Sequence, residues 1–202
     1  MPTDWTPAIT HLSAADPRLA PVIERHGHPT ITPRKDPIKS LARAIVSQQL
    51  SGKAADTIWG RFVALYPKGK FPKPVQILAT EDAKLRGAGL SGAKAAAIKD
   101  LARHVIEDKL VPARLAKLDD AGVSAMLLPV RGIGPWSVDM FLMFFLARPD
   151  VLPVGDLGIR KGMQKHFNLR KLPEAKRMLE LAAPWRPYRT IASWYMWRLL
   201  ES

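Results

Sequence analysis

Two short segments decide how this chain folds: Leu128-Pro129-Val130-Arg131-Gly132-Ile133-Gly134-Pro135-Trp136 and, after an apolar segment, Leu152-Pro153-Val154-Gly155-Asp156. The Gly-Ile-Gly turn lies between two helical patterns. Such a turn can present backbone N–H groups to a phosphate, because glycine tolerates positive φ and has no Cβ that blocks a close approach. The second segment places one carboxylate, Asp156, directly after a Pro-x-Gly turn. The pattern predicts a phosphate-binding turn and a reactive carboxylate.

The rest of the chain carries helical signals and no convincing alternating strand. Asp36-Pro37 and Pro135 are typical helix starts, and Ser91 is typical of a cap. The segment that begins at Pro135 is apolar on nearly every side, which is typical of a buried helix. We predict an all-α fold in which helices cover residues 13–26, 37–50, 52–65, 74–79, 80–87, 92–105, 121–128, 135–145, 157–167, 173–182 and 187–201.

The amino-acid composition limits the classes of molecule that this chain is expected to bind. The 202 residues carry a net charge of +13 with a pI near 10.3, which favours a polyanion such as nucleic acid. The absence of cysteine excludes disulfides, zinc thiolate sites and iron–sulfur clusters. The start has no basic segment followed by an apolar core, and the longest apolar run, 140–147, is too short for a membrane span. We therefore expect a cytoplasmic protein with no membrane partner.

Three motifs together resemble the helix-hairpin-helix (HhH-GPD) DNA glycosylase superfamily, and within it the 3-methyladenine DNA glycosylase II group. They are Leu128 to Met140, Leu152 to Asp156, and Ile45-Val46-Ser47-Gln48-Gln49-Leu50-Ser51, in the order and at the spacing of that family. The resemblance covers roughly residues 36–200. It implies two helical lobes with the active site in the cleft between them. We expect one unit, 1–202, with lobe 1 at about 37–135 and lobe 2 at about 1–36 plus 136–202.

The resemblance also implies roles for single residues. Asp156 matches the catalytic aspartate. Three residues line the base pocket by this match: Trp136, Met140 and Trp185. The residues expected to contact DNA are the hairpin residues Gly132, Ile133 and Gly134, together with Gln48 and Gln49, of which Gln49 is expected to be the wedge that fills the gap left by a flipped nucleotide. The family implies a monovalent cation, Na⁺ or K⁺, on the backbone carbonyls of Leu128, Val130 and Ile133, and no other cofactor.

A second glycine-rich turn contains Gly89 and Ser91, with Lys94 one turn into the next helix. This turn could also meet a DNA phosphate. Helix capping explains it nearly as well. Asp139 lies on the apolar helix, and we expect it to be a hydrogen-bonded structural carboxylate, with a second catalytic role as the alternative.

The chemistry agrees with the resemblance. A base in a duplex must be flipped out before its glycosidic bond can be reached, and aromatic walls attract a cationic alkylated purine. That purine leaves readily, so one carboxylate suffices to stabilise the positive sugar. Relatives that cut the backbone place a lysine where this chain has Trp136. We therefore expect a monomeric, monofunctional glycosylase without lyase activity, acting on double-stranded DNA with alkylated bases.

Simpler interpretations of the same residues remain. Asp156 could be only an N-cap of the following helix, and Trp136 and Trp185 could be core residues. The whole chain could be a non-catalytic DNA-binding module that kept the hairpin, or a glycosylase for oxidised or mismatched bases. These alternatives predict different products from damaged DNA.

Overall fold

The computed structural model describes residues 3–201, so Met1, Pro2 and Ser202, which belong to the expected lobe 2, lie outside the description. All regular structure within residues 3–201 is helical, which confirms the all-α prediction. The chain divides into two compact units: unit 1 comprises Met1–Pro33 and Asp139–Ser202, and unit 2 comprises Arg34–Val138. None of the helices described is long and apolar enough to cross a membrane.

Unit 2 begins with α3 and ends inside α10. Its helices are α3 (Pro37–Ser47), α4 (Gly52–Ala64), α5 (Pro74–Ala79), α6 (Asp82–Gly87), α7 (Gly92–Ile106), α8 (Pro112–Leu115), α9 (Asp120–Leu127) and the first residues of α10 (Pro135–Phe144), with a 3₁₀ turn η2 (Pro67–Gly69). Side-chain caps fix several starts: Asp36 accepts the N–H of Lys39, and Ser51 accepts that of Ala54. These starts agree with the sequence prediction.

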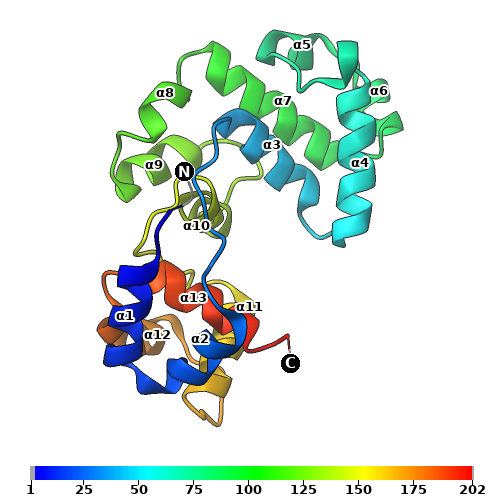
Figure 1. Ribbon diagram of the computed structural model, residues 1–202. Coiled ribbons are helices and arrows are strands. Elements are labelled where there is room, and N and C mark those ends of the chain that lie inside the picture. Colours follow the sequence, from blue (N-terminus) through cyan, green and yellow to red (C-terminus); the bar gives the residue numbers. More distant parts are fainter. Residues whose placement is uncertain (1–2, 202) are drawn as a thin grey trace. The chain divides into compact units, whose positions relative to one another are not determined.

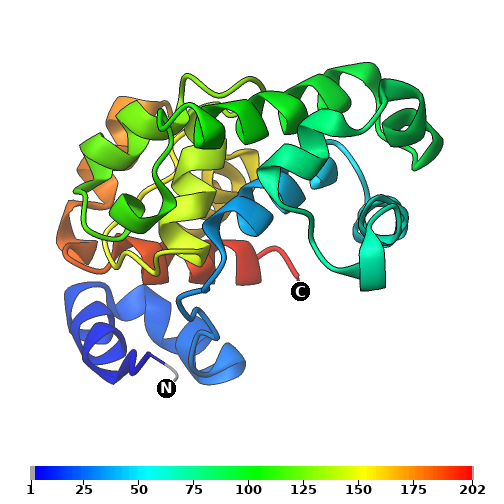
Figure 2. The ribbon, with the colours of Figure 1, turned by 90° about the horizontal axis from the view of Figure 1, so that it is seen from above.

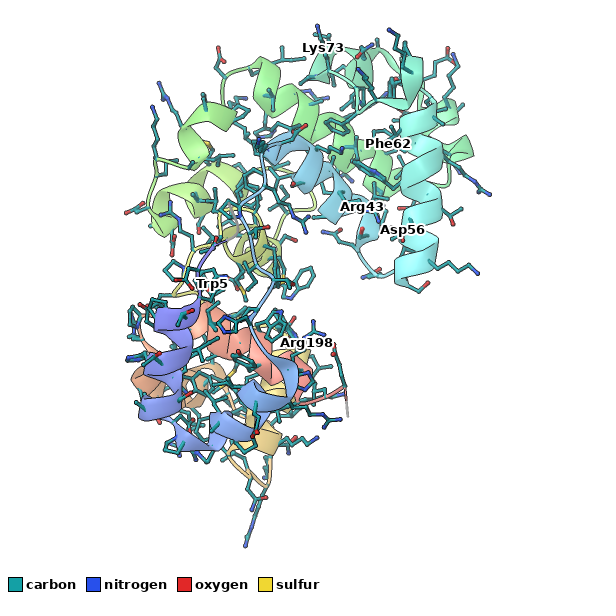
Figure 3. The ribbon with its side chains drawn as sticks, in the orientation of Figure 1. Trp5, Arg43, Asp56, Phe62, Lys73 and Arg198 are labelled. Carbon is teal, nitrogen blue, oxygen red and sulfur yellow. The ribbon has the colours of Figure 1, made fainter. Side chains whose placement is uncertain are left out.

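The longest helix, α7, is the centre of unit 2. It contacts α3, α5 and α6, and α3 also contacts α4 (Figure 1). The core beneath these helices contains fully buried Leu41, Phe62 and Ile98. Arg43 on α3 and Asp56 on α4 form an ion pair at the α3–α4 contact, where both are labelled (Figure 3). This packing fixes the direction of α3 and therefore the position of the residues that follow it.

Unit 1 combines the two ends of the chain. It contains α1 (Thr6–Ala15), η1 (Pro17–Leu19), α2 (Ala20–His26), the rest of α10, α11 (Leu157–His166), α12 (Ala175–Leu181), η3 (Ala183–Trp185) and α13 (Arg189–Arg198). The helix α13 contacts α1, α2 and α11 (Figure 2). At the α11–α13 contact a Cβ added to Gly162 would lie 2.3 Å from the carbonyl oxygen of Met196. Only glycine permits this close packing.

The N-terminal prediction needs a correction. A single helix over 13–26 is wrong: α1 starts at Thr6, and the chain leaves helical geometry at Asp16, where φ is −143° and ψ is 87°. Pro17 explains the break, because its ring disfavours the helical region for the residue before it. The break places the Asp16 side chain inside unit 1, where it is 3% exposed.

Candidate active site

The hairpin between α9 and α10 lies on unit 2 and exposes its backbone. Val130 and Ile133 are 1% and 6% exposed and hold it to the core. Gly132 has φ +81°, and a Cβ there would lie 3.1 Å from Cβ of Ala97, so both conformation and packing require glycine. The N–H groups of Gly132 and Gly134 donate to no group in the part of the chain that the structure describes. Two such N–H groups beside the start of α10 can bind an anion.

Gln48 and Gln49 follow α3 and meet the hairpin. The side-chain amide of Gln48 donates to the carbonyl oxygen of Gly132 at 2.8 Å, with Oγ of Ser137 at 3.5 Å. Gln49 is exposed and has φ +56°, a conformation that residues other than glycine rarely adopt. The structure thus brings the Gln48–Gln49 turn to the hairpin, although the two segments are more than eighty residues apart in sequence.

Lys94 has a different role from the predicted one. Its ammonium group donates to the carbonyl oxygens of Val46 at 2.8 Å and Gln48 at 2.7 Å, and burial lowers its pKa. We therefore correct Lys94 from a phosphate contact to an internal cap for the end of α3. Ser91 caps α7 by accepting the N–H of Lys94, and Gly89 adopts φ +99° beside Ile58. Capping and packing thus explain the second glycine-rich turn.

Asp156 is held in place on unit 1 by two donors. It is the N-cap of α11, and its Oδ1 accepts the N–H of Ile159 at 2.8 Å and the indole N–H of Trp197 at 3.0 Å. The capping interpretation is therefore correct, but capping does not exclude a catalytic role. It sets the orientation of the carboxylate.

Two residues that support Asp156 were not identified from the sequence. Trp197 on α13 stacks on Phe144 of α10, with ring centroids 5.7 Å apart. Gly158 leaves room for the indole, because a Cβ there would lie 2.8 Å from the Trp197 ring and 3.0 Å from Oδ1 of Asp156. The sequence offers one signal: Gly158 is the second residue of a helix, where glycine has no helix-forming advantage.

Asp139 lies on α10 and is partly buried. Within residues 3–201 its side chain accepts no hydrogen bond and forms no ion pair, so the prediction of a hydrogen-bonded structural carboxylate is wrong. Burial, and secondly the negative charge of Asp156, raise the pKa of Asp139 to about 6. Unit 1 therefore brings two carboxylates close enough to repel each other.

The three predicted pocket residues differ in exposure. Trp136 is 44% exposed and Met140 is partly buried, so both offer surface to a ligand. Trp185 is 0% exposed. Its indole N–H donates to Oδ2 of Asp16 at 3.0 Å, and its ring packs on Phe167 with centroids 5.6 Å apart. The prediction that Trp185 lines the base pocket is therefore wrong, because the side chain is part of the unit 1 core.

The cation predicted for the hairpin has suitable ligands. The carbonyl oxygens of Leu128 and Ile133 accept no hydrogen bond from the residues described, and that of Val130 accepts one from Ile133. Backbone carbonyl oxygens are hard ligands that suit a cation such as Na⁺ or K⁺. No group of three or more His, Cys, Asp or Glu side chains in the described chain could hold a transition metal.

Comparison with known proteins agrees with these features. A family model described as HhH-GPD superfamily base excision DNA repair protein matches residues 42–187. DNA-3-methyladenine glycosylase 1 of Schizosaccharomyces pombe is 34% identical over 201 residues, which cover 97% of this chain and 88% of that protein. The chain therefore belongs to the HhH-GPD superfamily of base excision DNA repair proteins, as the sequence motifs predicted.

Two solved structures have the same fold. A Schizosaccharomyces pombe 3-methyladenine DNA glycosylase in complex with abasic DNA superposes with a TM-score of 0.85 at 34% identity and covers 96% of each chain. A DNA-3-methyladenine glycosidase from Bacillus halodurans gives a TM-score of 0.82 at 35% identity and covers 98% of this chain and 90% of that one.

Proposed function

We propose that this protein is a monofunctional DNA glycosylase that hydrolyses the N-glycosidic bond of alkylated bases, chiefly 3-methyladenine-like ones, in double-stranded DNA. The observation that carries the proposal is the orientation of Asp156 by Ile159 and Trp197 in a member of this family. The names of the relatives support the substrate class.

In the proposed reaction the base is flipped out of the duplex. An alkylated purine carries positive charge, so it leaves with the electron pair of the C1′–N bond and becomes neutral without a proton donor. The ionised Asp156 stabilises the positive charge that develops on the sugar. Water adds its oxygen to C1′ and loses a proton to solvent, which leaves an abasic site.

Trp136 supports both substrate choice and the absence of a lyase step. Its exposed indole can stack on a flipped purine, with a cation–π contribution of about 0.5 to 2 kcal/mol. A tryptophan offers no amine, so no Schiff base with the sugar forms at this position. Met140, one helical turn further along α10, adds an adaptable apolar surface.

The hairpin holds DNA without selecting any base. The N–H groups of Gly132 and Gly134 bind a backbone phosphate, and a monovalent cation on the carbonyls of Leu128, Val130 and Ile133 would add positive charge there. Gln49 enters the gap left by the flipped nucleotide. The hydrogen bond from Gln48 to Gly132 keeps this wedge in register with the hairpin.

Base release from methylated duplex DNA, with the products identified by chromatography, tests the proposed activity. We expect free 3-methyladenine and an abasic site, whereas a non-catalytic DNA-binding protein releases nothing and a glycosylase for oxidised bases releases 8-oxoguanine from a matched substrate instead. Borohydride added during turnover is expected to trap no covalent adduct. A trapped adduct would contradict the monofunctional assignment.

A further inference from the structure

We propose that Asp139 is a second functional carboxylate of this enzyme, whose negative charge favours cationic lesions and the cationic sugar over their neutral counterparts. The inference rests on the proposed glycosylase function and names a residue that sets its specificity. Asp156 remains the carboxylate that faces the reacting sugar.

The position of Asp139 supports this role. It follows Trp136 by three positions on α10, a spacing that places two side chains on the same helix face. Met140, the proposed base-pocket residue of unit 1, directly follows Asp139 on α10. Unit 1 also places Asp139 within electrostatic reach of Asp156.

The lack of a partner is the second observation. Burial disfavours the ionised form of a carboxylate, and a hydrogen-bond donor or a nearby cation offsets that cost. Asp156 has Ile159 and Trp197 as donors, whereas nothing in the described part of the chain donates to Asp139. Burial and the charge of Asp156 together raise the pKa of Asp139 to about 6, and no Lys, Arg or His among the residues described offsets the shift.

A bound cation would supply the missing partner. In the free enzyme two carboxylates repel each other, so ionised Asp139 is unfavourable. A positively charged base or sugar relieves that repulsion, whereas a neutral ligand does not. The enzyme therefore gains binding energy selectively from cationic ligands and most of all from the transition state, in which the positive charge spreads onto the sugar.

Two DNA duplexes that differ only in charge test this proposal. One carries a pyrrolidine in place of the lesion nucleotide, whose ring amine stays protonated between pH 5 and 8. The other carries the neutral tetrahydrofuran analogue. For the wild type we expect tighter binding of the pyrrolidine duplex than of the tetrahydrofuran duplex at pH 7.5. The margin, which is the ratio of the two dissociation constants, should shrink as the pH falls through about 6, because Asp139 then takes up a proton.

Asp139→Asn is expected to reduce this margin about tenfold at pH 7.5 and to remove the pH dependence near 6, with binding of the tetrahydrofuran duplex unchanged. Glu174→Gln is the matched control, because it removes one negative charge from an exposed side chain and should leave the margin as in the wild type. An unchanged margin in Asp139→Asn, or an equal loss on both duplexes, overturns the proposal.

Melting temperature separates this role from a structural one. Because folding raises the pKa of Asp139, its ionised form costs stability above pH 4, and the cost is complete above about 6. Asp139→Asn should therefore melt higher than the wild type at pH 7.5, and the gain should vanish near pH 4. A lower melting temperature at pH 7.5 would make Asp139 a structural carboxylate. Base release by the wild type tests the proposed glycosylase function separately, because the release of a base does not depend on the affinity ratio of the two duplexes.

Discussion

The indole N–H of Trp197 donates to Oδ1 of Asp156 at 3.0 Å. The same oxygen accepts the N–H of Ile159 at 2.8 Å, so two donors from α13 and α11 fix the carboxylate. A carboxylate held in this way is already oriented when positive charge develops on the substrate, and no reorganisation is needed at that moment. The contact between α11 and α13 is thereby part of the proposed active site.

Trp197→Phe tests the contribution of this hydrogen bond. The variant keeps an aromatic ring against Phe144 but loses the donor, so we expect single-turnover base release to fall about tenfold at unchanged affinity for DNA. Trp5→Phe is the matched control, because Trp5 donates its indole N–H to the carbonyl oxygen of Ile31. That variant should lose stability only. Equal activity of the wild type and Trp197→Phe would show that the indole does not position Asp156.

Gly158→Ala tests the space that the indole needs. The added Cβ would lie 2.8 Å from the ring of Trp197, so either the ring or Asp156 must move. We expect base release to fall about tenfold or more, with helical content retained. In Gly155→Ala the added Cβ meets nothing within 4 Å, so that variant should behave as the wild type. If both variants retain full activity, the close approach has no functional meaning.

The proposed phosphate-binding role of the hairpin predicts how a substitution at Gly132 changes the affinity for DNA. Gly132→Ala forces a residue with a Cβ into φ +81° beside Ala97, so the hairpin must distort. We expect weaker binding of undamaged and damaged duplexes by the same factor, about tenfold, because phosphate contacts carry no sequence information. Gly60→Ala, on an exposed face of α4 with open space around it, serves as the control. Fluorescence anisotropy at several salt concentrations measures both variants. A loss confined to damaged DNA would contradict the phosphate-binding role.

The polar cluster in the core of unit 1 predicts a pure stability effect. Asp16 accepts hydrogen bonds from Trp185 at 3.0 Å and His166 at 2.8 Å. Trp185→Phe leaves Asp16 one donor short, and we expect the free energy of unfolding to fall by about 1 to 3 kcal/mol. Lesion preference should not change, because Trp185 is fully buried. Denaturant titration and base release from two different lesions check this pair of expectations. A changed lesion preference would show that Trp185 lines the base pocket.

Local signals in the sequence predicted much of the fold. Asp36, Ser51, Ser91 and Asp156 each have a capping side chain, and each caps the helix that was expected to follow it. The break before Pro17 was missed, although proline restricts the residue before it and could have indicated the break. Helix α1 was missed because its apolar residues form only a weak pattern.

The candidate site was harder to predict because its contacts join residues far apart in the chain. Trp197 reaches Asp156 only when α13 packs on α11, and Lys94 reaches the end of α3 only when α7 packs beside it. The burial of Trp185 depends on Asp16, which lies at the other end of the chain. A motif can indicate which residues matter, but only packing shows which of them face a ligand and which support the core.

Asp156→Asn, assayed for single-turnover release of 3-methyladenine from methylated duplex DNA, tests the central claim most directly. Asparagine keeps the oxygen that caps α11 but removes the negative charge, so the fold and the affinity for DNA should be retained. We predict a fall in the rate of base release of at least about a hundredfold. A rate equal to that of the wild type would contradict the assignment of Asp156 as the catalytic carboxylate.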